Sequence, residues 1–274
     1  MASFYLALLA IAAALFVANN RMLFGLSTGP VPEDFAAFVT PKDEALEYYL
    51  EKHQKEIGKD YEAYRGHCLR VLSFTKYFLS LENIQLDPRI FNIIAMALAY
   101  HDIGLWTDKE LNYLEPSVVQ MTKRVLEEMK LSKQNEGDEG GSIVYMPHRF
   151  HWSTFEEDSD IASTIIMEHH KFTSYDHYSN NNQNESEEGG NGGNQQPVSI
   201  RVDHMNEIVN AVRKADWADA TMGVIRFGLP QSLLGAAYEA IPDAGFHNCL
   251  LNMGSRLSPD SIRGQMEVLK ILKW

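Results

Sequence analysis

The sequence predicts an all-α protein, because apolar residues recur at intervals of three and four along most of the chain. Two further observations support this class. Almost no stretch alternates apolar and polar residues as a strand would, and Pro, Asp and Gly mark the starts and ends of the periodic stretches. Of the 274 residues, 45% are hydrophobic and 22% charged, so the chain can bury a sizeable core. We therefore expect a helical bundle without a β-sheet.

Residues 1–24 form a hydrophobic segment, predicted to be a membrane anchor or a signal peptide. The segment has no basic start, and Arg21 follows its apolar run. These features favour an uncleaved anchor that contacts a membrane through residues 4–20, with the domain on the cytoplasmic face. The alternatives are a signal peptide, which would direct the chain to the secretory pathway, and a buried helix of a cytoplasmic protein. Residues 25–40 contain Gly and Pro and are predicted to be a linker.

The first two predicted helices lie on either side of Gly58. Thr40 and Pro41 can cap and begin the first helix, which Gly58 ends. The second helix begins at Asp60, and a histidine interrupts its apolar stripe. The members of this stripe are Tyr64, His67, Val71, Phe74 and Phe78.

The next two predicted helices begin at prolines. Pro88 begins one of them after the capping residue Asp87, and its apolar face runs into His101-Asp102 before the helix stops near Gly104. The other helix spans about 116–131.

Two more helices follow, separated by a low-complexity insertion. Asp158 or Ser159 can cap the first, which ends at a pair of histidines, and the second begins at about Asp203. Residues 179–197 between them are rich in Asn, Gln, Gly and Glu and are predicted to be a disordered surface insertion. The tail, 258–274, is predicted to be another amphipathic helix.

Charge and cysteine content exclude several classes of function. The chain has 24 Lys and Arg against 37 Asp and Glu, a net charge of −13 that repels a phosphate backbone. A nucleic-acid duplex is therefore not an expected partner. The two cysteines, Cys68 and Cys249, have no CxxC spacing and cannot form a disulfide framework, which fits a reducing compartment.

Polar residues interrupt the apolar faces of four predicted helices and point to a metal site. Burying imidazole or carboxylate groups is costly unless they are paired, and a divalent cation would pair with all of them at once. A mixed His and Asp set predicts a divalent transition metal, Mn, Fe, Co, Ni or Zn, as one or two ions. The predicted ligands are His67, His101, Asp102, His169, His170 and Asp216.

The motifs around these residues resemble those of the HD-domain superfamily of metal-dependent phosphohydrolases, which are α-helical bundles. The matching stretches are YRGHCLRVL, ALAYHDIG and VRKADWADA, within residues 60–228. The resemblance implies one HD-type helical domain over 41–274. It also implies that His67, His101, Asp102 and Asp216 hold one metal ion, with Asp102 able to bridge to a second.

The paired histidines leave open whether the site holds one ion or two. His169 and His170 diverge by about 100° on a helix, so both can face one site only near a helix end. Their pairing resembles two-metal members of the family. Asp102 and Asp219 are further predicted as catalytic carboxylates, Asp219 as a general acid/base or as an outer partner of a ligand. Lys171 is predicted to orient a phosphate group.

The predicted activity is the hydrolysis of a small phosphorylated substrate, a phosphate ester such as a nucleotide, by metal-activated water. The absence of GxSxG, GxxxxGK[ST] and HExxH motifs disfavours other common catalytic arrangements. Two alternatives remain: an HD-type di-iron oxygenase, and a domain that binds a nucleotide or a partner without turnover.

Overall fold

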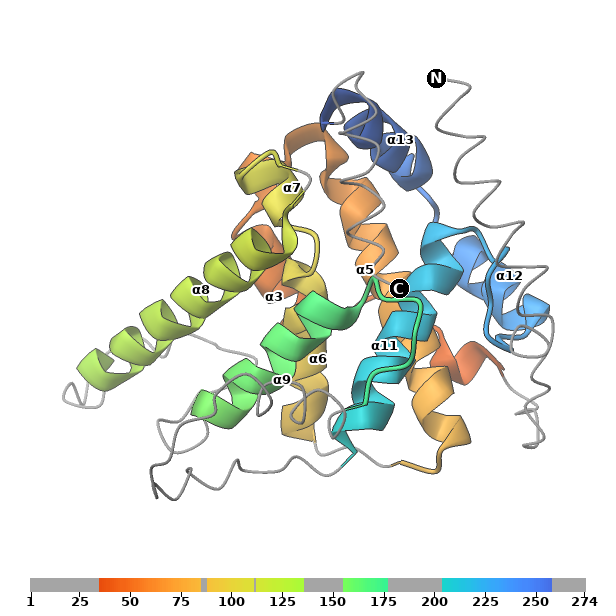
Figure 1. Ribbon diagram of the computed structural model, residues 1–274, viewed down its shortest axis with the longest axis horizontal. Helices are drawn as coiled ribbons and strands as arrows, with labels where there is room; N and C mark the ends of the chain where they lie inside the picture. The colour runs from red at the N-terminus through yellow and green to blue at the C-terminus, as the bar shows by residue number, and fades with distance from the viewer. Residues whose placement is uncertain (1–34, 85–87, 111, 136–154, 177–203, 258–274) are drawn as a thin grey trace, which may run out of the picture.

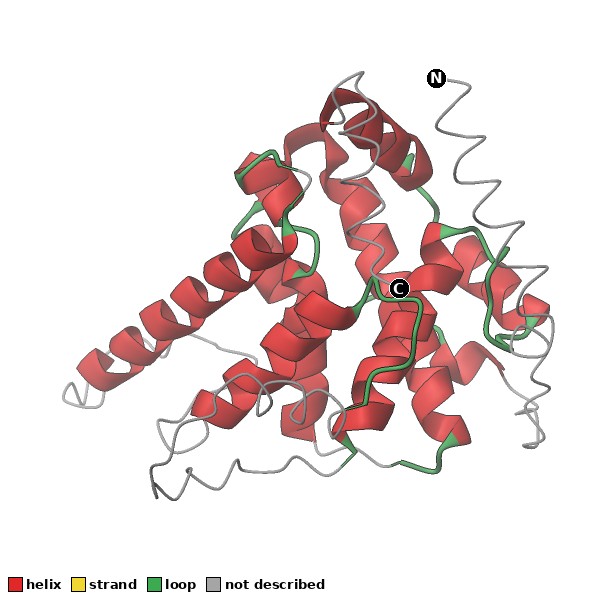
Figure 2. Cartoon of the chain, viewed as in Figure 1, coloured by secondary structure: helices red, strands yellow, loops and turns green. Residues whose placement is uncertain are grey.

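The computed structural model describes residues 35–84, 88–110, 112–135, 155–176 and 204–257. Within these ranges the chain consists of helices and loops and contains no strand, as the sequence predicts (Figure 2). The hydrophobic segment 1–24, the insertion 179–197 and the tail 258–274 lie outside the described residues. The described helices are η1 Phe35–Phe38, α3 Glu44–Glu51, α4 Gln54–Ile57, η2 Gly58–Asp60, α5 Tyr61–Leu81, α6 Pro88–Tyr100, α7 Gly104–Thr107, α8 Leu114–Asn135, α9 Phe155–Glu168, α11 Met205–Ala220, α12 Gln231–Ala240 and α13 Phe246–Leu257.

Some helix boundaries differ from the sequence predictions because other residues provide the caps. Asp43, rather than Thr40, caps α3, and its carboxylate accepts the Leu46 N–H at 3.0 Å. The single helix predicted to reach Gly58 is divided into α3 and the short α4. The prediction that α9 starts at Asp158 or Ser159 is also wrong. The helix begins at 155, so Asp158 lies in its first turn, where a negative charge complements the helix dipole.

The described end of the segment predicted as a linker packs against the domain. The Phe38 ring meets Tyr77 of α5 edge-on at 5.6 Å, and the Thr40 N–H donates to Ser73 Oγ at 2.9 Å. Residues 35–40 are therefore held by the same core as the helices that follow.

The core is built around α5 and α11, which pack along each other near the centre of the molecule (Figure 1). Helix α6 packs against α9 and α3, and α8 lies alongside α9. The stretch Pro88–Thr107 has the length and apolar composition of a membrane span, but 83% of that window is buried inside the protein. This burial is expected for a core helix, and it brings the His101-Asp102 turn into the interior.

Candidate metal centre

Packing of these helices gathers all six predicted ligands. His67 lies in α5 and Asp216 in α11, the two helices with the most extensive mutual packing. The pair His101-Asp102 follows α6, and the paired histidines follow α9, which packs against α6. Ligand atoms within 4.8 Å of one another form three overlapping groups: His67, His101 and Asp216; His101, Asp102 and His169; and His169, His170 and Asp216.

The first of these groups, which we call the inner group (His67, His101 and Asp216), is almost completely buried. The Nε2 atoms of His67 and His101 lie 3.0 Å apart, and Asp216 Oδ1 lies 3.2 and 3.7 Å from them, respectively. His67 Nδ1 lies 2.7 Å from Asp219 Oδ2, and His101 Nδ1 lies 2.6 Å from the Leu98 carbonyl. Because both partners are acceptors, each Nδ1 carries a proton, and each ring turns its Nε2 lone pair toward the centre of the group once Nε2 is deprotonated.

The remaining ligands form the outer group (Asp102, His169 and His170). His169 Nδ1 donates to the Ile166 carbonyl at 2.7 Å, which leaves its Nε2 as an acceptor 3.3 Å from Asp102 Oδ1. Both of these atoms are buried and have no hydrogen-bond partner. His170 is farther away, with Nε2 3.7 Å from Asp102 Oδ1 and Nδ1 3.9 Å from Asp216 Oδ2. Its side chain is 21% exposed, so the outer group forms the accessible side of the cluster.

These residues fit a metal ion by the chemistry of their atoms. Buried acceptor atoms that face one another need positive charge between them, which either protons on the imidazoles or a metal ion can supply. Imidazole nitrogen and carboxylate oxygen are ligands of divalent transition metals, and outward-facing N–H groups bonded to carbonyls or carboxylates are the usual support of ligating histidines.

Burial disfavours charge on these groups and lowers the pKa of His170, but at His67, His101, Asp102 and Asp216 the contacts within the cluster outweigh it. Hydrogen bonds to Asp216 and Asp219 raise the pKa of His67 despite burial, and the charge of Asp102 likewise raises the pKa of His101 well above its usual range. Although burial acts in the opposite direction, the same histidines hold the pKa of Asp102 and Asp216 below the ordinary value. The carboxylates are therefore ionised, and a divalent cation can replace the protons on the imidazoles.

Asp219 lies behind His67 rather than at the centre of the cluster. Arg70 donates to Asp219 from Nε at 2.6 Å and from Nη2 at 2.9 Å, so both carboxylate oxygens are occupied. Arg70 is itself held by the Ile241 and Pro242 carbonyls, which lie at 3.2 and 3.0 Å from its Nη1. This geometry matches the role of an outer partner that orients a ligand, one of the two roles predicted for Asp219.

Lys171, the cation predicted to orient a phosphate, has another partner. Its Nζ donates to Glu168 Oε1 at 2.6 Å. A second cation near the cluster in sequence, Lys214, has its Nζ 5.6 Å from the centre of the Phe78 ring. Positive charge for a substrate phosphate would therefore come chiefly from bound metal.

Sequence reasoning missed three aromatic residues that surround the cluster. The Phe246 ring of α13 stacks on His67 with centroids 4.0 Å apart, although no motif marks this segment. The Tyr64 hydroxyl accepts the Asp102 N–H at 3.1 Å, and the Tyr113 hydroxyl contacts His170 Nε2. Only Tyr64 had a signal, since it lies on the same helical stripe as His67, one turn earlier.

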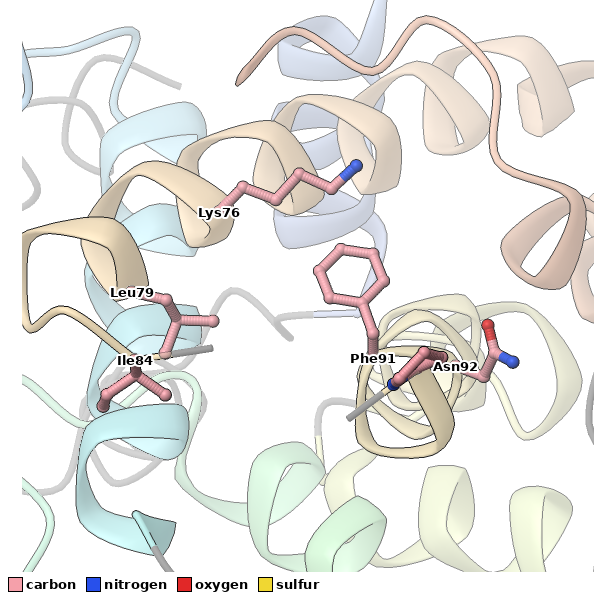
Figure 3. Close-up of a pocket in the computed structure, with 6 residues that line it drawn as sticks. Lys76, Leu79, Ile84, Phe91 and Asn92 are labelled. Carbon is pink, nitrogen blue, oxygen red and sulfur yellow. The ribbon is translucent and has the colours of Figure 1, made fainter. Parts of the chain in front are cut away.

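A separate pocket lies at the far end of α5. Its volume is about 440 Å³, and Lys76 of α5 and Phe91 of α6 face each other across it, with Nζ 4.8 Å from the ring centre (Figure 3). Lys76 is nine residues beyond His67, roughly 14 Å along the helix axis. None of its lining residues is a predicted ligand, so this pocket does not form part of the metal centre. The other lining residues are Leu79, Ile84, Pro88 and Asn92.

The fold and the site define an all-helical protein with a buried His and Asp cluster that can hold metal. Comparison of the chain with known protein families, curated proteins and solved structures found no match. The resemblance to the HD-domain superfamily rests on the sequence motifs.

Proposed function

We propose that this protein is an HD-type metal-dependent phosphohydrolase that acts on a phosphate ester such as a nucleotide. The observation that carries the proposal is the 3.0 Å approach of two buried imidazole Nε2 atoms, each with its Nδ1 bonded to an acceptor. Two nitrogens this close need a positive charge between them, and a divalent metal can supply it. A divalent metal would be held by the inner group, and a second ion by the outer group.

The chain's own residues would prepare the site for hydrolysis. Bound metal would supply a water of lowered pKa and neutralise charge on the phosphoryl oxygens. Asp102 and Asp216 would balance the charge of the ions, and Asp219 would keep His67 in the tautomer that presents Nε2. The substrate would enter beside His170, the ligand with the exposed side chain.

The pairing of Lys171 and Arg70 with carboxylates has a consequence for substrate binding. Because these cations are occupied and the chain carries a net charge of −13, phosphate binding should depend on metal. We expect removal of metal to weaken the affinity for the phosphate ester as well as to stop turnover.

The test is a panel of phosphate esters assayed with the protein purified without chelators, its metal content measured, and Mn, Fe, Co, Ni or Zn added in turn. We expect phosphate release with at least one metal, and none from an Asp102→Ala variant. Turnover by the variant equal to that of the original chain would contradict the proposal. Tight binding of a nucleotide without turnover under any metal would instead favour a binding domain.

A di-iron oxygenase is the second candidate, favoured by the two additional imidazoles of the outer group. Iron suits imidazole and carboxylate ligands together. Two iron ions per chain, together with dioxygen consumption and no phosphate release from the panel, would replace the hydrolase proposal with this one.

A further inference from the structure

The turn that carries the paired histidines is held from α11, by residues one and two turns before the ligand Asp216. Asn210, Arg213 and Asp216 are spaced by three residues, so each lies about 60° around the helix from the one before it. The first two make hydrogen bonds to the main chain that follows His170. Helix α11 therefore connects one predicted metal ligand, Asp216, to the segment that carries two others.

Arg213 binds the main chain directly after the histidine pair. Its Nη1 donates to the Phe172 carbonyl at 2.6 Å and to the Lys171 carbonyl at 3.2 Å. Only one residue, Lys171, separates His170 from the carbonyl at 2.6 Å. The guanidinium therefore restricts the direction in which the chain leaves the end of α9 and, with it, the placement of both imidazoles.

Asn210 binds the main chain farther along, at Tyr175. Its Oδ1 accepts the Tyr175 N–H at 2.9 Å, and its Nδ2 donates to the Tyr175 carbonyl at 3.0 Å. The same Oδ1 also accepts Arg213 Nε at 3.2 Å, which orients the guanidinium. Arg213 and Asn210 of α11 thus bind the main chain at the two ends of residues 171–175.

The burial of Arg213 makes this arrangement costly for the fold. The residue is 2% exposed, and the attraction of the Glu168 carboxylate does not compensate for its burial. Burial lowers the pKa of Arg213 to about 10, so the guanidinium stays charged at neutral pH. A buried charge satisfied by neutral main-chain and amide oxygens needs a reason to be kept, and the adjacent histidine pair supplies one.

We propose that Arg213 and Asn210 are positioning residues that set His169 and His170 at the second metal position. This inference rests on the proposed metal centre and assigns a separate supporting arginine to each of its two groups. Arg70 acts on the inner group through Asp219, and Arg213 acts on the outer group through the main chain. Weakening the hydrogen bonds of Arg213 should therefore lower the affinity for the ion at the outer group and leave the affinity for the ion at the inner group unchanged.

The first experiment measures Mn²⁺ binding to the full chain and to Arg213→Lys by calorimetry and elemental analysis. Lysine keeps the charge but loses the planar fork, which bonds Asn210 through Nε and the two carbonyls through Nη1. We expect the weaker of two binding steps to lose roughly 10–100-fold in affinity, as for other outer partners of metal ligands, and the tighter step to change less than about twofold. Arg124→Lys is the matched control, because Arg124 bonds Glu128 and Tyr48 on α8 and α3, away from the cluster.

A double-mutant cycle separates positioning from a general effect on the fold. In a His169→Ala background the outer site is already impaired, so adding Arg213→Lys should leave the affinity for the remaining ion unchanged. An additive loss in that background would show that Arg213 supports the whole domain and would overturn the proposal. Asn210→Ala, at a half-buried position, tests the same idea with a smaller expected loss if the arginine variant does not fold.

The outcomes distinguish this inference from the proposed function. If the original chain binds no metal, the metal centre itself is wrong. If it binds two ions and Arg213→Lys and Asn210→Ala both retain the two steps unchanged, the metal centre stands and the positioning role is wrong. A single ion per original chain would also overturn the inference, because the second position would not exist.

Discussion

The inner and outer groups of the candidate metal centre are built on different kinds of backbone. His67 and Asp216 of the inner group project from the interiors of α5 and α11, whose packing forms the core. His169 and His170 of the outer group lie beyond the last residue of α9. Helix packing therefore fixes two of the three inner ligands, whereas His101, like the outer histidines, depends on how the chain leaves a helix end.

The supporting contacts differ in the same way. His67 is backed by a buried carboxylate and an arginine, and its ring stacks on Phe246. His169 is backed by the carbonyl of Ile166, one turn earlier in its own chain segment, and His170 by the Tyr113 hydroxyl. A ligand with long-range support is more restricted than one with local support. We therefore expect an ion in the inner group to bind more tightly than one in the outer group.

The largest effect should come from Asp102→Ala, which removes a carboxylate that contacts a histidine of each group. Asp102 Oδ2 lies 3.3 Å from His101 Nε2, and Oδ1 lies 3.3 Å from His169 Nε2. We expect the loss of both ions, a larger effect than the roughly 100-fold typical of outer partners. Elemental analysis after dialysis measures it, with the exposed carboxylate Asp108 changed to Ala as control. Wild-type metal content in the Asp102 variant would show that the assigned ligands are wrong.

His169→Ala should reduce metal binding at the outer group only. Its Nε2 is a buried acceptor without a partner, so its removal should lower the metal content from two ions toward one. His170→Ala should cost less, because His170 is more exposed and lies 3.7 Å from Asp102. Equal metal per chain in the double alanine variant and the original would exclude these histidines as ligands.

Asp219→Asn should weaken the inner ion alone. Asparagine cannot hold His67 Nδ1 and Arg70 as the carboxylate does, so we expect a 10–100-fold loss of affinity at the tighter step. Competition with a chelating dye measures it, and the outer step serves as the internal reference. A uniform loss at both steps would mean that the two groups are not independently supported.

The smallest expected effect is a pH dependence of the stabilisation by metal. In the metal-free protein the raised pKa of His67 and His101 means that protonated imidazoles stabilise the fold at low pH, and this contribution is lost as pH rises through those values. Metal needs the deprotonated rings and binds better as pH rises. The difference in Tm between metal-loaded and chelator-treated protein should therefore grow from about pH 6 to about pH 8.5. A difference that shrinks over this range would contradict the assigned ligands.

The sequence alone predicted the six residues that the structure brings together. Imidazole and carboxylate groups on otherwise apolar helical faces are costly to bury, so their positions mark a site before any fold is known. The same helical spacing predicted an all-α chain, and the structure confirms it over the described residues. Helix starts were less predictable, because Asp43 and Thr40 are both good caps and local sequence does not choose between them.

The supporting partners and the accessible side of the site were decided only by tertiary structure. Asp219 meets His67 across 152 residues of sequence, and Lys171 pairs with Glu168 instead of facing the cluster. A side chain's type and spacing determine what it can bind, and these are local properties. Which of its atoms is free depends on neighbours that packing brings from elsewhere in the chain, and one sequence periodicity is compatible with many such neighbours.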